Sequence, residues 1–123
     1  MIKIGLTYTS ELIVNEEKTA IKMGSGDMPV LATPAMMALM ENAAMLAIAD
    51  HLPSGFTTVG GYIESSHLHP SSIGDKISAT ATVTKVDGKK IEFTVKAHCG
   101  EILLGEGKHI RFIVDRDKFL ARK

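Results

Sequence analysis

The chain has 123 residues, of which 45% are hydrophobic, and its 14 basic and 14 acidic residues cancel to zero net charge. This length predicts one domain spanning residues 1–123. Zero net charge gives no electrostatic support for nucleic acid or an anionic membrane as a partner, so we expect neither. The single cysteine, Cys99, excludes an internal disulfide, and no apolar run is long enough to cross a bilayer. We therefore expect a cytoplasmic protein.

The first quarter of the chain predicts short extended elements. Residues 6–14 are rich in threonine, tyrosine and aliphatic side chains, which favours a strand. Residues 15–17 indicate a turn, and residues 19–23 predict a short strand. The run Gly-Ser-Gly-Asp at residues 24–27 then breaks regular structure.

A long apolar helix is the most unusual predicted element. Thr33 followed by Pro34 indicates an N-cap and a first helical position, and the alanine, methionine and leucine residues that follow favour a helix up to Pro53. The helix is apolar on nearly every side, so we expect it to be buried on most of them. A soluble domain achieves this only by wrapping a sheet or a partner around the helix.

The second half of the chain predicts strands at residues 57–68, 76–86, 91–97 and 102–114. Asp87-Gly88 is a strong hairpin signal between the second and third of these. Alternation predicts one buried face on that hairpin, made by Ile77, Ala79, Ala81, Val83, Ile91, Phe93, Val95 and Ala97. The order of elements, without repeat or linker, predicts an α+β fold in which one antiparallel sheet packs on one helix.

Glu41 is a carboxylate on the apolar stripe of this helix. A lone carboxylate there costs free energy to bury unless it is paired or protonated, and such groups recur at functional sites. Alternatively, Glu41 reaches solvent at the edge of the helix or bonds to a partner chain. The residues alone leave these interpretations open.

His67 is the second candidate for chemistry. In an extended strand it shares a face with Val59, Gly61 and Ile63, which predicts that it points toward the helix. There it is either a general base near neutral pH or a hydrogen-bonded core histidine. His69 shares the same face, so the pattern does not choose between them.

Thr33 and the glycine pair each have a structural and a functional interpretation. Thr33 has a complete structural task as an N-cap, but a hydroxyl at a helix N-terminus also lies where negative charge is stabilised. Gly60 and Gly61 weaken a strand, which either makes space for the helix or exposes a backbone N–H to a carbonyl oxygen. The Lys-His-Ile-Arg run at residues 108–111 is a local positive cluster, and we expect it on a solvated strand face. No metal-ligand spacing or glycine-rich phosphate motif is present.

The spacing of these residues resembles one known family. The run Val-Leu-Ala-Thr-Pro-Ala-Met-Met-Ala-Leu-Met-Glu at residues 30–41 is similar to the fluoroacetyl-CoA thioesterase-like proteins. The resemblance continues through the glycine pair to His67, the turn at 70–75, the hairpin at 86–88 and the segment 109–112. It implies a hotdog fold, an antiparallel sheet wrapped around a long central helix, and hydrolysis of an acyl-CoA thioester to free acid and coenzyme A.

The family pattern also implies roles for particular residues. Its catalytic threonine, glutamate and histidine match Thr33, Glu41 and His67. Its substrate-binding positions match Gly60, Gly61 and Arg111. The resemblance further implies a homodimer, with higher assembly left open, and active sites at the subunit interface. Coenzyme A is then part of the substrate and product, and no separate cofactor or metal is expected.

The chain departs from the family pattern ahead of Thr33. The name-giving member has aromatic residues that shape a lid, whereas residues 15–32 here contain no phenylalanine, tyrosine or tryptophan. Asn42 also stands where relatives can carry an aromatic residue. Two alternative functions remain at this stage, a hotdog hydroxyacyl-thioester dehydratase and a non-catalytic acyl-CoA-binding dimer. The match at Thr33 disfavours the dehydratase.

Overall fold

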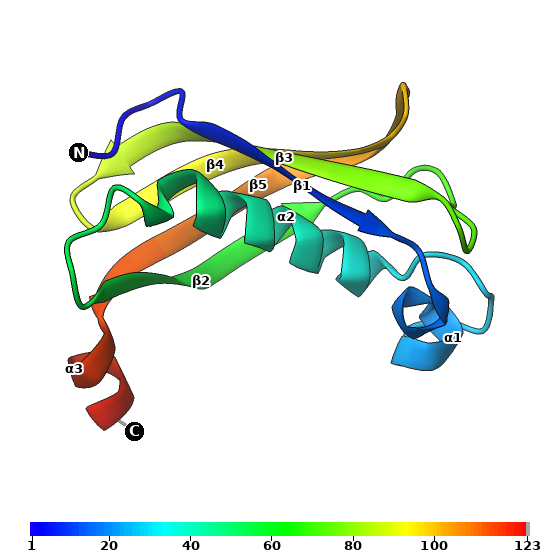
Figure 1. Ribbon diagram of the computed structural model, residues 1–123, viewed down its shortest axis with the longest axis horizontal. Coiled ribbons are helices and arrows are strands. Elements are labelled where there is room, and N and C mark those ends of the chain that lie inside the picture. Colours follow the sequence, from blue (N-terminus) through cyan, green and yellow to red (C-terminus); the bar gives the residue numbers. More distant parts are fainter. Residues whose placement is uncertain (123) are drawn as a thin grey trace.

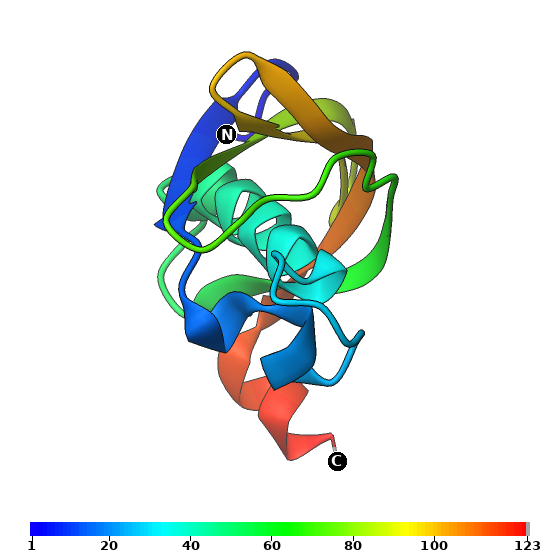
Figure 2. The same ribbon diagram turned by 90° about the vertical axis from the view of Figure 1, so that its right-hand side faces the viewer.

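The structure, a computed structural model, describes residues 1–122 and consists of a curved antiparallel sheet around one long helix (Figure 1). The strand order is β1-β3-β4-β5-β2. Helix α2 (Thr33–Ala49) lies along the concave face, and the view in Figure 2 shows the sheet curving around it. The predicted α+β class and wrapped sheet are therefore confirmed. The strands are β1 (Thr7–Ile13), β2 (Phe56–Ser65), β3 (Lys76–Asp87), β4 (Lys90–Cys99) and β5 (Ile102–Asp115).

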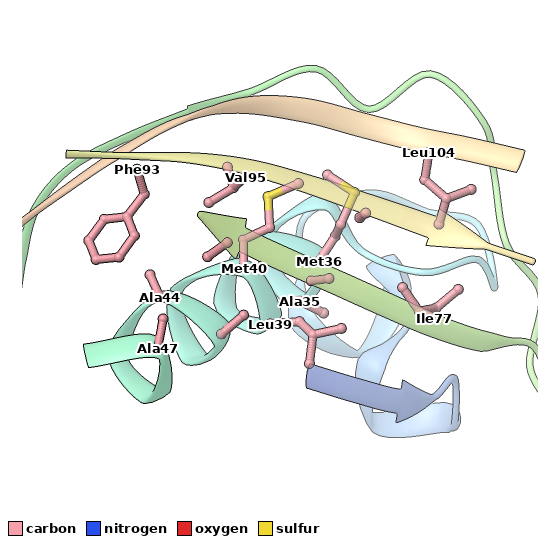
Figure 3. Close-up of a cluster of buried hydrophobic side chains, with 14 of the residues drawn as sticks. Ala35, Met36, Leu39, Met40, Ala44, Ala47, Ile77, Phe93, Val95 and Leu104 are labelled. Atoms are coloured by element: carbon pink, nitrogen blue, oxygen red, sulfur yellow. The ribbon is translucent and has the colours of Figure 1, made fainter. Parts of the chain in front are cut away.

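The core lies between α2 and the middle strands. All eight residues predicted to form the buried face of the β3–β4 hairpin are at most 1% exposed. Met36 and Met40 project from α2 toward Val95 and Leu104 on the sheet (Figure 3). The predicted turn between the two strands is also confirmed, since Gly88 follows Asp87 with φ of 61°, in the left-handed region that favours glycine.

Only one side of α2 is covered by the sheet. Its buried residues are Ala35, Met36, Leu39, Met40, Ala43, Ala44, Ala47 and Ile48. On the opposite side Ala38 and Leu46 are exposed, Leu46 by 37%. The prediction that the helix is buried on most of its sides is therefore met on one side only in a single chain. None of the helices within residues 1–122 has the length and apolar character needed to span a membrane.

Two sequence-based boundaries were wrong. Residues 19–23 form no strand, because the Thr19 side chain accepts a hydrogen bond from the backbone N–H of Lys22 and caps the short helix α1 (Ala20–Met23). That helix follows the 3₁₀ turn η1 (Glu16–Lys18). Strand β2 ends at Ser65, before His67, so the histidine lies in a connecting segment. A last helix, α3 (Arg116–Ala121), extends beyond β5.

We expect Ile91→Ala to lower the free energy of unfolding by about 2–5 kcal/mol, because Ile91 is fully buried and its truncation leaves a cavity. Urea denaturation measures this loss. Ile102→Ala is the matched control, because Ile102 is 52% exposed and its truncation removes little buried surface. Equal losses in the two variants would contradict the core described above.

Candidate active site

Thr33 and His67 are in direct contact. The Thr33 hydroxyl oxygen lies 2.7 Å from Nδ1 of His67. Thr33 is the first residue of α2, and the N-cap is Ala32, which is held in an extended conformation by its backbone N–H bond to the Lys18 carbonyl. The predicted N-cap role of Thr33 is therefore wrong by one position. Its hydroxyl is free of capping and bonds to the histidine instead.

Two glycines of β5 let the segment that carries His67 lie close against the backbone of β5. A Cβ atom on Gly105 would overlap the carbonyl of Ser66, and one on Gly107 would overlap the carbonyl of Glu64. The segment then stays paired to β5, since the Leu68 N–H bonds to the Leu104 carbonyl at 2.6 Å. Sequence reasoning missed these glycines, although their spacing of two on a predicted strand marks a close backbone approach.

The environment of His67 favours its neutral form. The ring is partly buried, and its Nε2 atom is buried without a hydrogen-bond partner among the residues that the structure describes. Burial lowers the pKa of His67 below its ordinary value of 6.5, and a backbone group of His69 offsets part of this shift. A neutral imidazole can accept the hydroxyl proton of Thr33 at Nδ1.

A pocket of about 260 Å³ opens beside this pair. Its lining includes Ala20, Ser25, Val30 and Leu31 from the region ahead of α2, and His69 from the segment after β2. His69 is exposed, and within residues 1–122 it makes no hydrogen bond to Thr33. Phenylalanine, tyrosine and tryptophan are absent from the described lining.

Glu41 belongs to a second cluster, around Gly60. A Cβ atom on Gly60 would lie 3.1 Å from Oε2 of Glu41, 3.3 Å from Cε1 of His109 and 3.6 Å from Nη1 of Arg111. Arg111 donates from Nε to the Thr58 hydroxyl at 2.8 Å and from Nη2 to the Thr58 carbonyl at 2.9 Å. Glu41 is close enough for its charge to raise the pKa values of His109 and Arg111, although burial lowers both pKa values overall.

The solvated face predicted for residues 108–111 is wrong for two of its members. His109 is 1% exposed and Arg111 is 7% exposed, because both point inward from β5 toward α2. Mutual hydrogen bonding satisfies them there, and alternation alone cannot reveal such a network. His109 and Thr58 are therefore site residues that the sequence interpretation missed.

Gly61 is separate from the Glu41 cluster. The β2–β5 register shifts between Gly60 and Tyr62, which makes Gly61 the extra residue of a bulge. A Cβ atom there would overlap the ring of Phe112. The bulge and the early end of β2 also break the predicted common face of Gly61 and His67. Asn42, next to Glu41, turns to β1, where it accepts a hydrogen bond from Ser10 at 2.7 Å.

The two clusters lie apart in one chain. Thr33 and Glu41 are eight residues apart on the same helix, which separates them by about 12 Å along its axis. The structure thus joins Thr33 with His67, and Glu41 with Gly60 and Arg111, but does not join all of them. No group of three or more His, Cys, Asp or Glu side chains within residues 1–122 is arranged to hold a metal ion.

Comparisons with known proteins agree with this fold. A family model described as "Fluoroacetyl-CoA-specific thioesterase" matches residues 14–117. The fluoroacetyl-CoA thioesterase of Streptantibioticus cattleyicolor is 29% identical over 98% of this chain and 91% of its own length. A solved structure of the fluoroacetyl-CoA thioesterase FlK has a TM-score of 0.93 at 29% identity, over 99% of this chain and 95% of that one.

A Thermus thermophilus protein described as a thioesterase superfamily member is 28% identical, with a TM-score of 0.90 over 98% of this chain and 90% of its own. A hot-dog-like protein from Thermanaerovibrio acidaminovorans is 25% identical, with a TM-score of 0.87 over 97% of this chain and 88% of its own. The fold is thus that of a hotdog-fold thioesterase.

The chain belongs to the fluoroacetyl-CoA-specific thioesterase family. Membership confirms the predicted fold family and the predicted enzyme class, an acyl-CoA thioester hydrolase. Neither the dehydratase nor the non-catalytic binding dimer receives support from these relatives.

We expect the His67 ring to titrate below pH 6.5, because burial desolvates its charged form and so lowers its pKa. Histidine NMR signals followed against pH measure the midpoint, and the His67→Gln variant assigns the resonance. A midpoint at or above 6.5 would contradict the burial described for the ring.

Proposed function

We propose that the chain hydrolyses an acyl-CoA thioester in a homodimer whose active sites each draw on both protomers. Thr33 and His67 of one protomer face Glu41, Gly60 and Arg111 of the other. The observation that carries this proposal is the 2.7 Å hydrogen bond between the Thr33 hydroxyl and His67. A hydroxyl paired with a neutral imidazole is the arrangement that activates a serine or threonine nucleophile.

The Thr33–His67 pair supplies the first chemical step of the proposed reaction. Oγ1 of Thr33 attacks the thioester carbon while Nδ1 of His67 takes the hydroxyl proton. The carbon–sulfur bond then breaks, and the proton passes from His67 to the departing thiolate of coenzyme A. Water next attacks the threonine ester, His67 takes a proton from it, and the free acid leaves as Thr33 regains its hydroxyl proton.

The second cluster supplies the charges around the acyl carbonyl. The backbone N–H of Gly60 and the guanidinium of Arg111 are donors suited to the oxyanion that forms during each step. Glu41 lies beside both, since its Oε2 would be 3.1 Å from a Cβ atom on Gly60. In the proposed reaction its carboxylate orients the water of the second step.

Three features support a site made by two protomers. Thr33 and Glu41 cannot meet in one chain, because about 12 Å of straight helix separates them. Strand β2, which carries Gly60, is an edge of the sheet and leaves one row of backbone groups open for pairing. The apolar residues exposed on α2, including Leu46, also favour coverage by a second copy. A twofold dimer uses the same surface on both partners.

The residues of the site also bear on the choice of substrate, the need for a cofactor and the location of the protein. The Streptantibioticus relative is named for fluoroacetyl-CoA, but the described lining of the pocket here contains no phenylalanine, tyrosine or tryptophan. We therefore propose weaker discrimination between fluoroacetyl-CoA and acetyl-CoA than an aromatic lid would give. Coenzyme A takes part only as the carrier of the acyl group, and no metal or other cofactor is required. The single, partly buried Cys99 supports a cytoplasmic location.

We expect purified protein to release free thiol from members of an acyl-CoA panel that includes acetyl-CoA and fluoroacetyl-CoA. Thr33→Val and His67→Gln should each lower kcat/KM by about 10²–10⁴-fold, because each removes one member of the proton-transfer pair. Thr33→Ser is the matched control, because it keeps the hydroxyl. In the wild type, kcat/KM should fall only as pH falls through the lowered pKa of His67, below 6.5.

Mass spectrometry of acid-quenched reactions locates any covalent intermediate in the same experiment. We expect the acyl group on the peptide that contains Thr33. An acyl group on the Glu41 peptide would assign the nucleophile to the carboxylate instead. If a folded dimer released no thiol from any member of the panel, the proposed function would be ruled out.

Mixing two inactive variants tests the shared site. Thr33→Val and Glu41→Gln protomers, unfolded together and refolded, should recover about a quarter of the wild-type activity. Half of the dimers are then mixed, and in each of these one of the two sites is fully native.

The matched control for this experiment mixes Thr33→Val with His67→Gln. These two residues touch within one protomer, so every site in the mixed dimer lacks one of them and no recovery is expected. Recovery in the control, or none in the first mixture, would argue that Glu41 serves the site of its own chain.

A further inference from the structure

His109 is the one buried titratable side chain whose two ring nitrogens both have defined partners among the described residues. Nδ1 lies 2.7 Å from the carbonyl oxygen of Tyr62, and Nε2 lies 3.2 Å from Nη1 of Arg111. A carbonyl oxygen only accepts a hydrogen bond, so Nδ1 carries the proton. A guanidinium nitrogen only donates, so Nε2 is the acceptor. Only the neutral Nδ1–H tautomer satisfies both bonds.

The position of the ring leaves it little freedom to turn. His109 is 1% exposed and stacks on Phe93 of β4, with ring centroids 5.9 Å apart and planes 29° apart. On the β2 side, a Cβ atom on Gly60 would be 3.3 Å from Cε1 of the ring. A flipped ring would point a C–H group at the Arg111 guanidinium and lose both bonds. Packing and hydrogen bonding therefore select the same orientation.

The charges around His109 also favour the neutral ring. Burial and the positive charge of Arg111 both lower its pKa, while the Tyr62 carbonyl and the charge of Glu41 on α2 raise it by less. Protonation would put two N–H donors face to face in a buried space. The charged groups that face the ring from the neighbouring elements are thus Arg111 and Glu41, and the net pKa shift is downward.

Arg111 is held by neutral acceptors only. These are Nε2 of His109, the hydroxyl of Thr58 and the carbonyl of Thr58. Within residues 1–122 no carboxylate lies within ion-pair distance of its guanidinium, although Glu41 is near enough to act through its charge. The guanidinium is therefore fixed in direction while its positive charge is not cancelled by a contacting anion.

We infer that His109 is a positioning residue of the thioesterase site: as the Nδ1–H tautomer held by the Tyr62 carbonyl, it aims the Arg111 guanidinium at the space beside Gly60 and Glu41. This inference rests on the proposed function of that cluster. His109 does not touch the reacting atoms. Its effect reaches the substrate through Arg111, because a fixed donor stabilises developing charge without the cost of reorienting during the reaction.

The first test compares three variants of His109 in the full-length protein. His109→Gln offers a side-chain carbonyl oxygen near the place of Nε2 and should keep kcat within a few-fold of the wild type. His109→Asn keeps a donor for the Tyr62 carbonyl but no acceptor for Arg111, and His109→Leu has neither. Both should lower kcat by about 10–100-fold, with a smaller change in KM, because a bond to a charged group is lost.

A double-mutant cycle separates positioning from an independent role. In an Arg111→Ala background, His109→Leu should cause almost no further loss of kcat, since the group that it positions is gone. Thermal unfolding of all variants identifies those that lose structure. Additive losses in the folded variants, or a His109→Leu enzyme as active as the wild type, would overturn the inference.

Nitrogen NMR of histidine- and arginine-labelled protein gives a readout that needs no turnover. The His109 ring should be neutral and show the Nδ1–H tautomer above its ordinary pKa of 6.5, between about pH 7 and pH 8. The Arg111 Nε–H signal should be sharp in the wild type and in His109→Gln, and broadened in His109→Leu. A protonated ring or an Nε2–H tautomer in this range would overturn the inference, whereas absence of thioester hydrolysis with these signals intact would count only against the proposed function.

Discussion

The fit of α2 into the concave face of the sheet is the constraint on which the rest of the structure depends. Alanines on both surfaces, such as Ala44 on the helix and Ala79 and Ala81 on β3, allow close approach, and the two central methionines fill the deeper space above them. The helix backbone is thereby fixed against the sheet. This also fixes the positions of Thr33, the first residue of the helix, and of Glu41 at its middle. The strand residues beside them are fixed in the same way.

Much of this architecture could be predicted because the spacing of apolar residues along a segment indicates which of its faces is buried. Alternation on β3 and β4 gives the buried face directly, and a long apolar helix in a short chain requires a sheet to cover it. The candidate site was predicted in a different way. Thr33, Glu41 and His67 each had a structural interpretation, and only their joint spacing, through its resemblance to a family, made them candidates. The contact between Thr33 and His67 agrees with that choice.

Other features could not be predicted because they depend on contacts between distant segments. His109 and Arg111 carry polar side chains that suit a solvated strand, and only the hydrogen bonds to Thr58 and Tyr62 explain their burial. The bulge at Gly61 changes which residues of β2 face inward, and a one-residue shift of this kind leaves little trace in composition. The position of His67 likewise depends on glycines nearly forty residues further along the chain.

The spacing of Thr33 and Glu41 on one straight helix has a consequence for how the chain can vary in length. Each added helical residue turns everything beyond it by about 100° and advances it by about 1.5 Å. One insertion between the two residues would therefore swing Glu41 away from Gly60 and disturb the packing of the whole second half of α2. The segment of residues 24–29 ahead of the helix carries no such periodic constraint. The structure therefore predicts that length changes are tolerated in that loop and in the turns, and not within α2 between Thr33 and Glu41.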